Sequence, residues 1–324
     1  MPTANLITRL PSLTSGPPVA VIGNVNLDIR TSPLPASERL FADGETSVRE
    51  IYETLGGGAA NLAVAAAQLG GVVHLCACIG ADALGERLEQ SLRAFGVSLH
   101  LRRKPVPTGR SINLVWDQGH RHFVSSLPNT QVLEPDDIDF SEWAACRHVF
   151  RADIWFAERL LEAGNAALLR EARQRGMETS LDINWDPLWS VPGNAEQVAW
   201  RKQQVLQILP LVDYVHGNEH ELMIFAGASD VDTACRAVLD HGAGHVICHC
   251  GAQGSAWFNA TDGRVPVPAT PVERSVCATG CGDVFSAAFL LLHELPMFER
   301  LRECGRIAAG HLAGQWNLLP RLSG

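Results

Sequence analysis

Ala278-Thr279-Gly280-Cys281-Gly282-Asp283-Val284-Phe285 is the stretch of the sequence that says most about its fold and chemistry. Two glycines flank one small residue, and the apolar residues from Val284 to Leu292 predict a helix that begins directly after them. A glycine turn at a helix start leaves backbone N–H groups without helical partners, and the helix dipole adds partial positive charge. The stretch therefore predicts a phosphate site. The alternative is an ordinary helix start, in which Asp283 serves only as a capping residue.

Outward from this stretch, short apolar runs alternate with amphipathic segments along the chain. The predicted strands are Val19–Gly23, Val72–Ile79, Thr179–Ile183, Tyr214–Val215, His245–Cys250 and Ser255–Phe258. The predicted helices are Leu62–Leu69, Leu84–Phe95, Ala157–Arg175, Glu196–Leu209, Glu219–Phe225, Thr233–His241, Val284–Leu292 and Arg302–Ala313. This alternation predicts an α/β fold with a doubly wound, mainly parallel sheet flanked by helices.

Two segments interrupt the alternation. Residues 31–52 are polar and rich in turn residues, and residues 101–127 have a strand–turn–strand pattern centred on Asp117-Gln118-Gly119. We expect them to pair into a small β lid over the carboxyl ends of the strands, where such sheets bind ligands. Residues 1–18 are rich in Pro, Ser and Thr and are expected to form an N-terminal tail, followed by one domain over residues 19–324.

Composition excludes several classes of protein. The chain has 324 residues, 46% of them hydrophobic and 19% charged, as in ordinary globular proteins. A formal net charge of −9 argues against general nucleic-acid binding or binding to anionic membranes. The longest apolar stretch, about Ala59 to Val73, is too short and too interrupted to span a bilayer.

The cysteines and lysines narrow the chemistry further. The nine cysteines form no disulfide framework, so we expect a reducing, cytoplasmic location. Cys76-x-Cys78 and Cys248-His249-Cys250 do not have zinc-site spacing and are expected to be buried strand cysteines. A mechanism that needs a lysine has only Lys104 and Lys202 as candidates.

Two further motifs have candidate chemistry. Gly56-Gly57-Gly58 would let a ligand approach the backbone closely, and Asn61 could hydrogen-bond a hydroxyl group, although a plain tight loop is the alternative. Asn218-x-x-Glu221 at a helix start could hold hydrated Mg²⁺ or could simply cap the helix. The chain has neither a Walker loop nor a dinucleotide-binding fingerprint, which disfavours a nicotinamide-dependent oxidoreductase.

Taken together, these motifs resemble the ribokinase/PfkB family of carbohydrate and nucleoside kinases. The stretches that carry the resemblance are Val21–Asp28 (first strand), Gly56–Gly70 and Ala278–Phe289 (two family signatures), Asn218-x-x-Glu221 (magnesium motif) and Gly251–Gly254 (nucleotide turn). Their order and spacing match the family over roughly residues 19–317. The resemblance implies a ribokinase-like fold and an ATP-dependent sugar kinase that transfers the γ-phosphoryl group to a sugar hydroxyl.

The resemblance also implies roles for individual residues. Asp283 would be the general base, and the N–H groups of Gly280, Cys281 and Gly282 would hold the charge on the transferred phosphoryl group. Residues implied to bind the sugar are Asn26, Asp28, Gly57, Gly58 and Asn61. Residues implied to bind ATP and Mg²⁺ are Asn218, His249, Gly251 and Gly254 for the nucleotide and Glu221 for the metal. The exposed edges of the lid would allow a homodimer.

Several positions depart from the family pattern. The usual Asp-Thr pair is Cys277-Ala278, so activation by K⁺ through that site is not expected, because K⁺ prefers oxygen ligands. Asp186 stands where fructokinase-like members have an arginine. Arg110 and Arg151 could face the cleft and select an acidic sugar, or could lie exposed on the surface.

Two other functions stay open. A nucleoside kinase of the same fold would need an aromatic wall for the base, which Trp116 or Phe123 could supply. A catalytically weak sugar-binding regulator would account for the departures at Cys277, Ala278 and Asp186.

Overall fold

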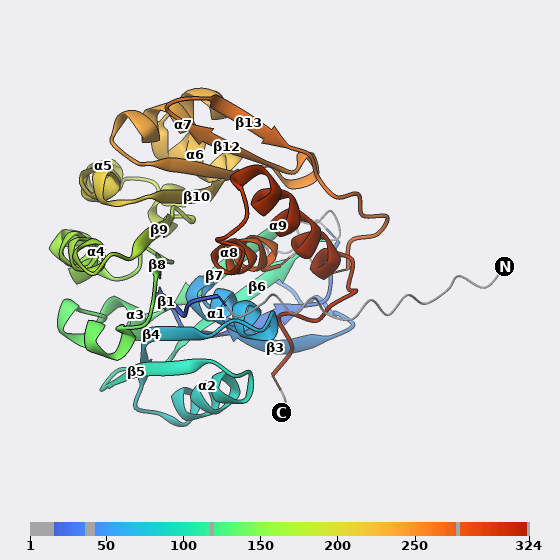
Figure 1. The fold of residues 1–324 in the computed structure, drawn as a ribbon. Coiled ribbons are helices and arrows are strands. Elements are labelled where there is room, and N and C mark those ends of the chain that lie inside the picture. Colours follow the sequence, from blue (N-terminus) through green and yellow to red (C-terminus); the bar gives the residue numbers. More distant parts are fainter. Residues whose placement is uncertain (1–15, 36–42, 117–119, 277–278, 323–324) are drawn as a thin grey trace.

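The computed structural model describes residues 16–35, 43–116, 120–276 and 279–322. Its centre is a nine-stranded sheet with the order β13-β12-β11-β10-β9-β8-β1-β4-β5 (Figure 1). The strands are β1 (Val19–Ile22), β4 (Val73–Gly80), β5 (Ser98–Lys104), β8 (His148–Arg151), β9 (Glu178–Asp182), β10 (Tyr214–Asn218), β11 (His245–His249), β12 (Ser255–Asn259) and β13 (Gly263–Val267). Pairing is parallel from β5 to β11 and antiparallel at β12 and β13, which confirms the predicted mainly parallel sheet.

Helices cover both faces of this sheet, as the alternating pattern predicts. One hydrophobic cluster contains α1 (Gly58–Gln68), α2 (Ala83–Ala94), α8 (Cys281–Leu291) and α9 (Met297–Leu312). The cluster on the other face contains α4 (Asn165–Gln174), α5 (Ala195–Ile208), α6 (Glu219–Ala226) and α7 (Val231–Asp240). Helix α1 is alanine-rich and buried along most of its length, so α8 can pack directly beside it (Figure 1).

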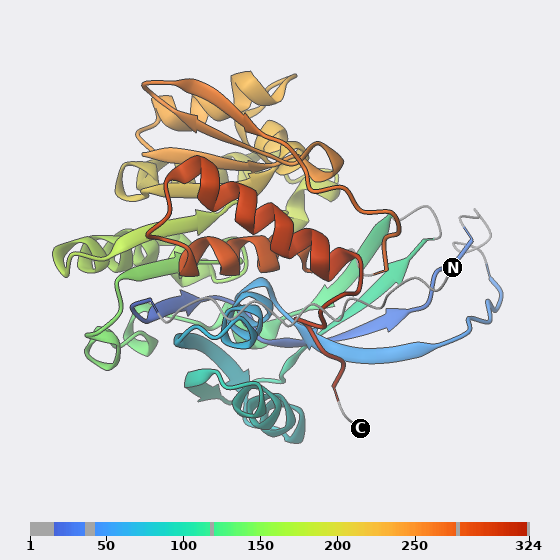
Figure 2. The ribbon, with the colours of Figure 1, turned by 45° about the vertical axis from the view of Figure 1, so that its right-hand side comes forward.

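A second, four-stranded sheet has the order β3-β2-β6-β7. Its strands are β2 (Asn26–Thr31), β3 (Ile51–Gly56), β6 (Gly109–Val115) and β7 (Arg121–Ser126), and the short helix α3 (Pro128–Gln131) follows it. Because β2 follows β1 and β6 follows β5, this sheet extends from the carboxyl edge of the main sheet (Figure 2). It is the small β layer that the sequence predicts.

The boundaries differ from the predicted ones in several places. Residues 101–104 pair with β4 at the edge of the main sheet, so the inserted hairpin begins only at Gly109. A π-helical turn, Leu160–Gly164, precedes α4 within the predicted helix 157–175. Strand β8 is not predicted, because its ends are the polar residues His148 and Arg151, although all four residues are buried. Residues 1–15 of the predicted tail and the turn at 117–119 lie outside the described residues.

Candidate active site

The site is built where the strand order reverses, at the carboxyl ends of β1 and β8. Asp153 follows β8 and has a φ of 55°. Its buried carboxylate accepts hydrogen bonds from the N–H groups of Asn24 (2.9 Å), Gly58 (3.1 Å) and Ala59 (2.9 Å). Asp153 therefore caps α1 from 94 residues away in the chain. Burial raises the pKa of Asp153, and these N–H donors partly oppose the shift.

Steric contacts explain why glycines occur where the end of β1, Asp153 and the start of α1 meet. Gly57 has φ 96°, and a Cβ atom there would collide with the carbonyl group of Asn24. A Cβ atom on Gly23 would lie 2.8 Å from Asp153 Oδ2. Glycine therefore allows the end of β1, Asp153 and the start of α1 to lie in direct contact.

Helix α8 begins beside α1 with an open glycine turn. Gly280 has φ 75°, a side chain there would collide with Leu319, and the helix has no side-chain cap. Gly282 is exposed, so the turn faces solvent. On the inner side, His311 lies 3.2 Å from the backbone oxygen of Thr279. The turn has the free space and the orientation that an anion site at a helix N-terminus needs.

Asp283 lies in the first turn of α8, half-buried, and accepts a hydrogen bond from Asn61 Nδ2 of α1 (3.0 Å). Burial raises the pKa of Asp283 to about 8, with a further contribution from the Asp153 carboxylate and an opposing one from the Asn61 bond. A carboxylate whose pKa lies near the physiological range, beside an open anion-binding turn, can accept a proton from a bound alcohol.

Three more carboxyl groups, Asp28, Asp182 and Glu221, surround Asp283. Burial raises the pKa of Asp28 to about 6, and it raises the pKa of Glu221. Burial and the neighbouring Glu221 and Asp283 carboxylates hold the pKa of Asp182 well above its usual range. This concentration of carboxyl groups favours a bound cation. Within the described residues no three metal-ligating side chains converge, but Mg²⁺ on a nucleotide needs only one or two carboxylates, so Asp182 and Glu221 fit it.

The predicted nucleotide residues come together at the ends of β10 and β11. Asn218 and His249 are paired in register, and the turn Gly251–Gln253 follows, with Gly254 at φ 101°. His249 packs on Phe285 with ring centroids 4.6 Å apart, and burial lowers the pKa of His249 to about 4, so the ring is neutral. A Cβ atom on Gly282 would lie 3.5 Å from His249 Nδ1. His249 therefore lies beside the glycine turn at the start of α8.

Asn218 and Glu221 form a reciprocal capping box at the start of α6. Glu221 N–H donates to Asn218 Oδ1 (2.9 Å), and Asn218 N–H donates to Glu221 Oε2 (3.0 Å). Helix capping, the alternative that the sequence leaves open, is thus present in the structure. It fixes the Glu221 carboxylate beside Asp182.

The predicted sugar residues on β2 are also placed at the site. Asn26 Nδ2 donates to Asp28 Oδ1 (2.9 Å), and a side chain on the facing Gly56 would collide with Asp28. The N–H of Gly58 and the amide of Asn61 are both engaged within the protein, by Asp153 and Asp283.

The structure shows the surroundings of most residues that were noted as departing from the family pattern or as candidates to select an acidic sugar. Asp186 is buried and pairs with Arg201 of α5 at 2.8 Å, so a guanidinium is present beside it. Arg151 is fully buried and donates to Asn165 Oδ1 (2.9 Å), which makes both predicted environments for it, cleft and surface, wrong. Arg110 is exposed. Cys277 and Ala278 lie outside the part of the chain that the structure describes.

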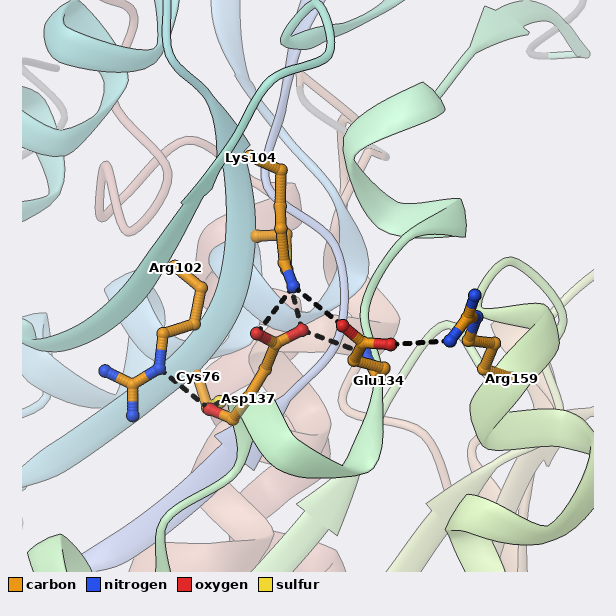
Figure 3. A network of polar contacts seen from close by, with 7 residues as sticks. Cys76, Arg102, Lys104, Glu134, Asp137 and Arg159 are labelled. Atoms are coloured by element: carbon orange, nitrogen blue, oxygen red, sulfur yellow. Dashed lines mark hydrogen bonds and ion pairs between the residues drawn. The ribbon is translucent and has the colours of Figure 1, made fainter.

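Both lysines are engaged elsewhere. Lys104 contacts Asp137 (2.7 Å) and Glu134 (3.2 Å), and Glu134 also pairs with Arg159 (Figure 3). Lys202 donates to the carbonyl oxygen of Ala226 (3.1 Å). Neither lysine therefore contributes charge to the site.

Sequence reasoning missed Asp153 and gave no role to Asp182. Both are acidic residues at or just past the carboxyl end of a strand, Asp153 at the reversal of strand order and Asp182 on the adjacent strand β9. That position is the signal that could have identified them. Asp153 was not recognised because its strand, β8, was not predicted.

Comparisons with known proteins identify the family to which this chain is similar. A family model described as pfkB family carbohydrate kinase matches residues 18–317. A ribokinase from Arabidopsis thaliana is 24% identical over 324 residues, covering 95% of this chain and 78% of that protein. A cytidine kinase from Thermococcus kodakarensis is 26% identical over 290 residues, covering 89% of this chain and 92% of that protein.

Solved structures share the fold. The fructokinase with bound ATP from Xylella fastidiosa has a TM-score of 0.73 at 20% identity, and the match covers 94% of this chain and 95% of that one. In the described part of the chain, no helix combines the length and the apolarity that crossing a bilayer would need.

Proposed function

The chain belongs to the pfkB family of carbohydrate kinases, phosphotransferases with hydroxyl acceptors, and on that basis we propose that it is an ATP-dependent sugar kinase with Asp283 as general base. The observation that carries this proposal is the placement of Asp283. It lies in the first turn of α8 beside an open glycine turn, and Asn61 fixes its carboxylate at 3.0 Å.

In this proposal, Asp283 takes the proton from the attacking sugar hydroxyl. The N–H groups of Gly280, Cys281 and Gly282 stabilise the charge on the phosphoryl group as it moves, which is the main requirement of phosphoryl transfer. The sugar hydroxyls are bound by residues at the lid and at the start of α1, namely Asn26, Asp28, Gly57, Gly58 and Asn61.

The nucleotide lies across the ends of β10 and β11. Asn218, His249, Gly251 and Gly254 line this position, and the neutral His249 ring adds no positive charge to it. Glu221 and Asp182 would hold Mg²⁺, which supplies charge neutralisation at the phosphates when bound. The second sheet serves as a lid that keeps water away from the reacting phosphate.

A nucleoside kinase is the second candidate. Phe123 of β7 is 47% exposed and is paired in register with Asn113, so an aromatic ring is present on the lid. A catalytically weak regulator is less well supported, because the Asn61–Asp283 contact holds the proposed base in position.

The test is an ADP-release assay across ketoses, aldoses, sugar acids, inositols and nucleosides with Mg²⁺ and ATP. We expect acceptor-dependent ADP release with sugars. Preference for nucleosides would favour the second candidate, and binding of sugar and ATP without ADP release would favour the regulator.

We also propose a cytoplasmic location and a homodimer that forms through the lid. All eight described cysteines are free thiols, as in proteins of reducing compartments. Ile112 and Val124 are paired in register on one face of the lid, and their exposures of 46% and 55% leave an apolar surface for a second copy.

A further inference from the structure

The inner face of the lid carries a buried arginine. Asn26, Asp28 and Arg30 alternate along β2 and point to the same face, which is the face that contains the proposed sugar residues. Arg30 is only 7% exposed, and its register partners are Asn113 on β6 and Tyr52 on β3. The Arg30 guanidinium therefore lies in the interior of the protein, two residues along β2 from Asp28.

This part of the lid contains several polar atoms without partners. Arg30 Nε, both amide atoms of Asn113 and Thr54 Oγ1 are buried, and none has a hydrogen-bond partner among the described residues. Asn113 is 0% exposed and Thr54 is 7% exposed. Buried polar groups are normally satisfied, because an unpaired one costs free energy. Such a group of atoms around one sheet face indicates a polar ligand.

The charge balance around Arg30 shows what kind of ligand fits. Its one charged contact within the described chain is Asp28 Oδ2 at 3.8 Å, which is too long for a hydrogen bond. A guanidinium has five N–H donors in a planar fork and can bind a carboxylate or a phosphate through two of them. A neutral sugar would leave this buried cation without a hydrogen-bonded anion, since Asp28 lies beyond hydrogen-bond distance.

Arg30 lines one cavity with Asn61, the residue whose side chain donates to the proposed general base. Arg30 and Thr54 line it together with Asn61, Thr279 and Leu319. Asn61 holds Asp283, and Thr279 precedes the anion turn. One molecule in this cavity can therefore reach Asn61 and Asp283 with a hydroxyl group and Arg30 with its other end.

We propose that the acceptor carries an anionic group, a carboxylate or a phosphate ester, which binds Arg30 while its hydroxyl group faces Asp283. This inference rests on the proposed sugar kinase function and names its substrate class as acidic sugars. Thr54, which also lines the cavity, supplies a further hydrogen bond to the same end of the acceptor.

The test compares matched acceptors in the ADP-release assay. D-ribose, D-fructose and D-glucose are each compared with the sugar acid and with the terminal monophosphate of the same carbon skeleton. We expect kcat/KM to be about 10–100-fold higher for one anionic series than for the neutral sugars, the range of a charge-assisted hydrogen bond. Which series is preferred distinguishes a carboxylate from a phosphate ester.

Variants assign the preference to Arg30. Arg30→Gln removes the charge and should abolish the preference by raising KM for the anionic acceptor, while KM for ATP stays unchanged. Arg30→Lys should retain part of the preference for the anionic acceptor. Arg110→Gln is the matched control, because Arg110 lies on the neighbouring strand β6 with its side chain exposed, and it should keep the wild-type ratio.

Two results would overturn the inference and leave the kinase function standing: a wild-type preference for neutral sugars, or an unchanged acceptor ratio in both Arg30 variants. If no acceptor of any class were phosphorylated, the proposed function itself would fail. The wild-type ratio needs no variant, so the inference stays testable even if Arg30→Gln does not fold.

Discussion

Asp283 owes two properties to its burial and to the neighbouring carboxylates. The same surroundings that lift its pKa to about 8 also make it a stronger base than a solvated aspartate. Because only the ionised carboxylate accepts a proton, we expect kcat/KM to rise with pH through an acid limb with a midpoint near 8. A pH–rate profile from 5 to 10 measures this. A rate that is flat across that range would contradict the assignment.

The raised pKa also predicts an effect on stability. Burial raises the pKa of Asp283 from 3.8 in the unfolded chain to about 8 in the folded protein, so the folded state binds the proton more tightly. Its contribution to stability is therefore full at low pH and is lost as pH rises towards 8. Relative to the wild type, Asp283→Asn should therefore be more stable at pH 8 than at pH 4, by more than the roughly 1.4 kcal/mol that one pKa unit represents.

Thermal unfolding of both proteins at the two pH values checks this expectation. If the difference between the variant and the wild type does not change with pH, the Asp283 carboxyl group is not in the environment described here.

At the scale of elements, Asp153 holds the start of α1 in position. The Asp153 carboxylate accepts hydrogen bonds from three backbone N–H groups. Asp153→Ala removes this carboxylate and should lower the free energy of unfolding by about 1–2 kcal/mol. Because α1 carries Asn61, kcat should also fall roughly tenfold or more. Urea unfolding and steady-state kinetics measure the two effects.

Asp230→Ala is the matched control for this prediction. Asp230 caps α7 through Thr233 N–H at 2.8 Å, on an exposed part of the other face of the sheet. It should lower stability without changing kcat. Equal losses of kcat in the two variants would show that Asp153 has no special role in positioning α1.

Elements with a strong local pattern could be predicted from sequence, and contacts between distant segments could not. The glycine turn before α8 and the capping box at Asn218 are local, and both are present. The Asp153 cap of α1 joins residues 95 positions apart at Gly58. Such contacts depend on strand order, which hydrophobic periodicity does not contain.

In the lid, too, local contacts could be predicted from the sequence and contacts between distant strands could not. Its hairpin, β6–β7, follows from local alternation of apolar and polar residues. The parallel pairing of β2 with β6 places Arg30 beside Asn113 across 83 residues of chain, so the unpaired polar group at the inner face became visible only in the structure.

At the scale of the whole molecule, the apolar outer face of the lid predicts the oligomeric state. Light scattering after size-exclusion chromatography should give the mass of a dimer for the wild type. Val124→Glu places a charge in the proposed interface and should give a monomer. Val191→Glu is the control, because Val191 is 49% exposed outside the lid and its replacement should leave the dimer intact. A wild-type monomer at micromolar concentration would contradict the proposed interface.

The most direct test of the account is the turnover of Asp283→Asn. The variant keeps the size of the side chain and an oxygen that can accept the Asn61 bond, but it cannot take up the proton. We predict that kcat falls by about 10²–10⁴-fold, that calorimetry gives an unchanged Kd for ATP, and that the exposed control Asp240→Asn retains wild-type kcat. A kcat for Asp283→Asn within a few-fold of wild type would contradict the role of Asp283 as the general base.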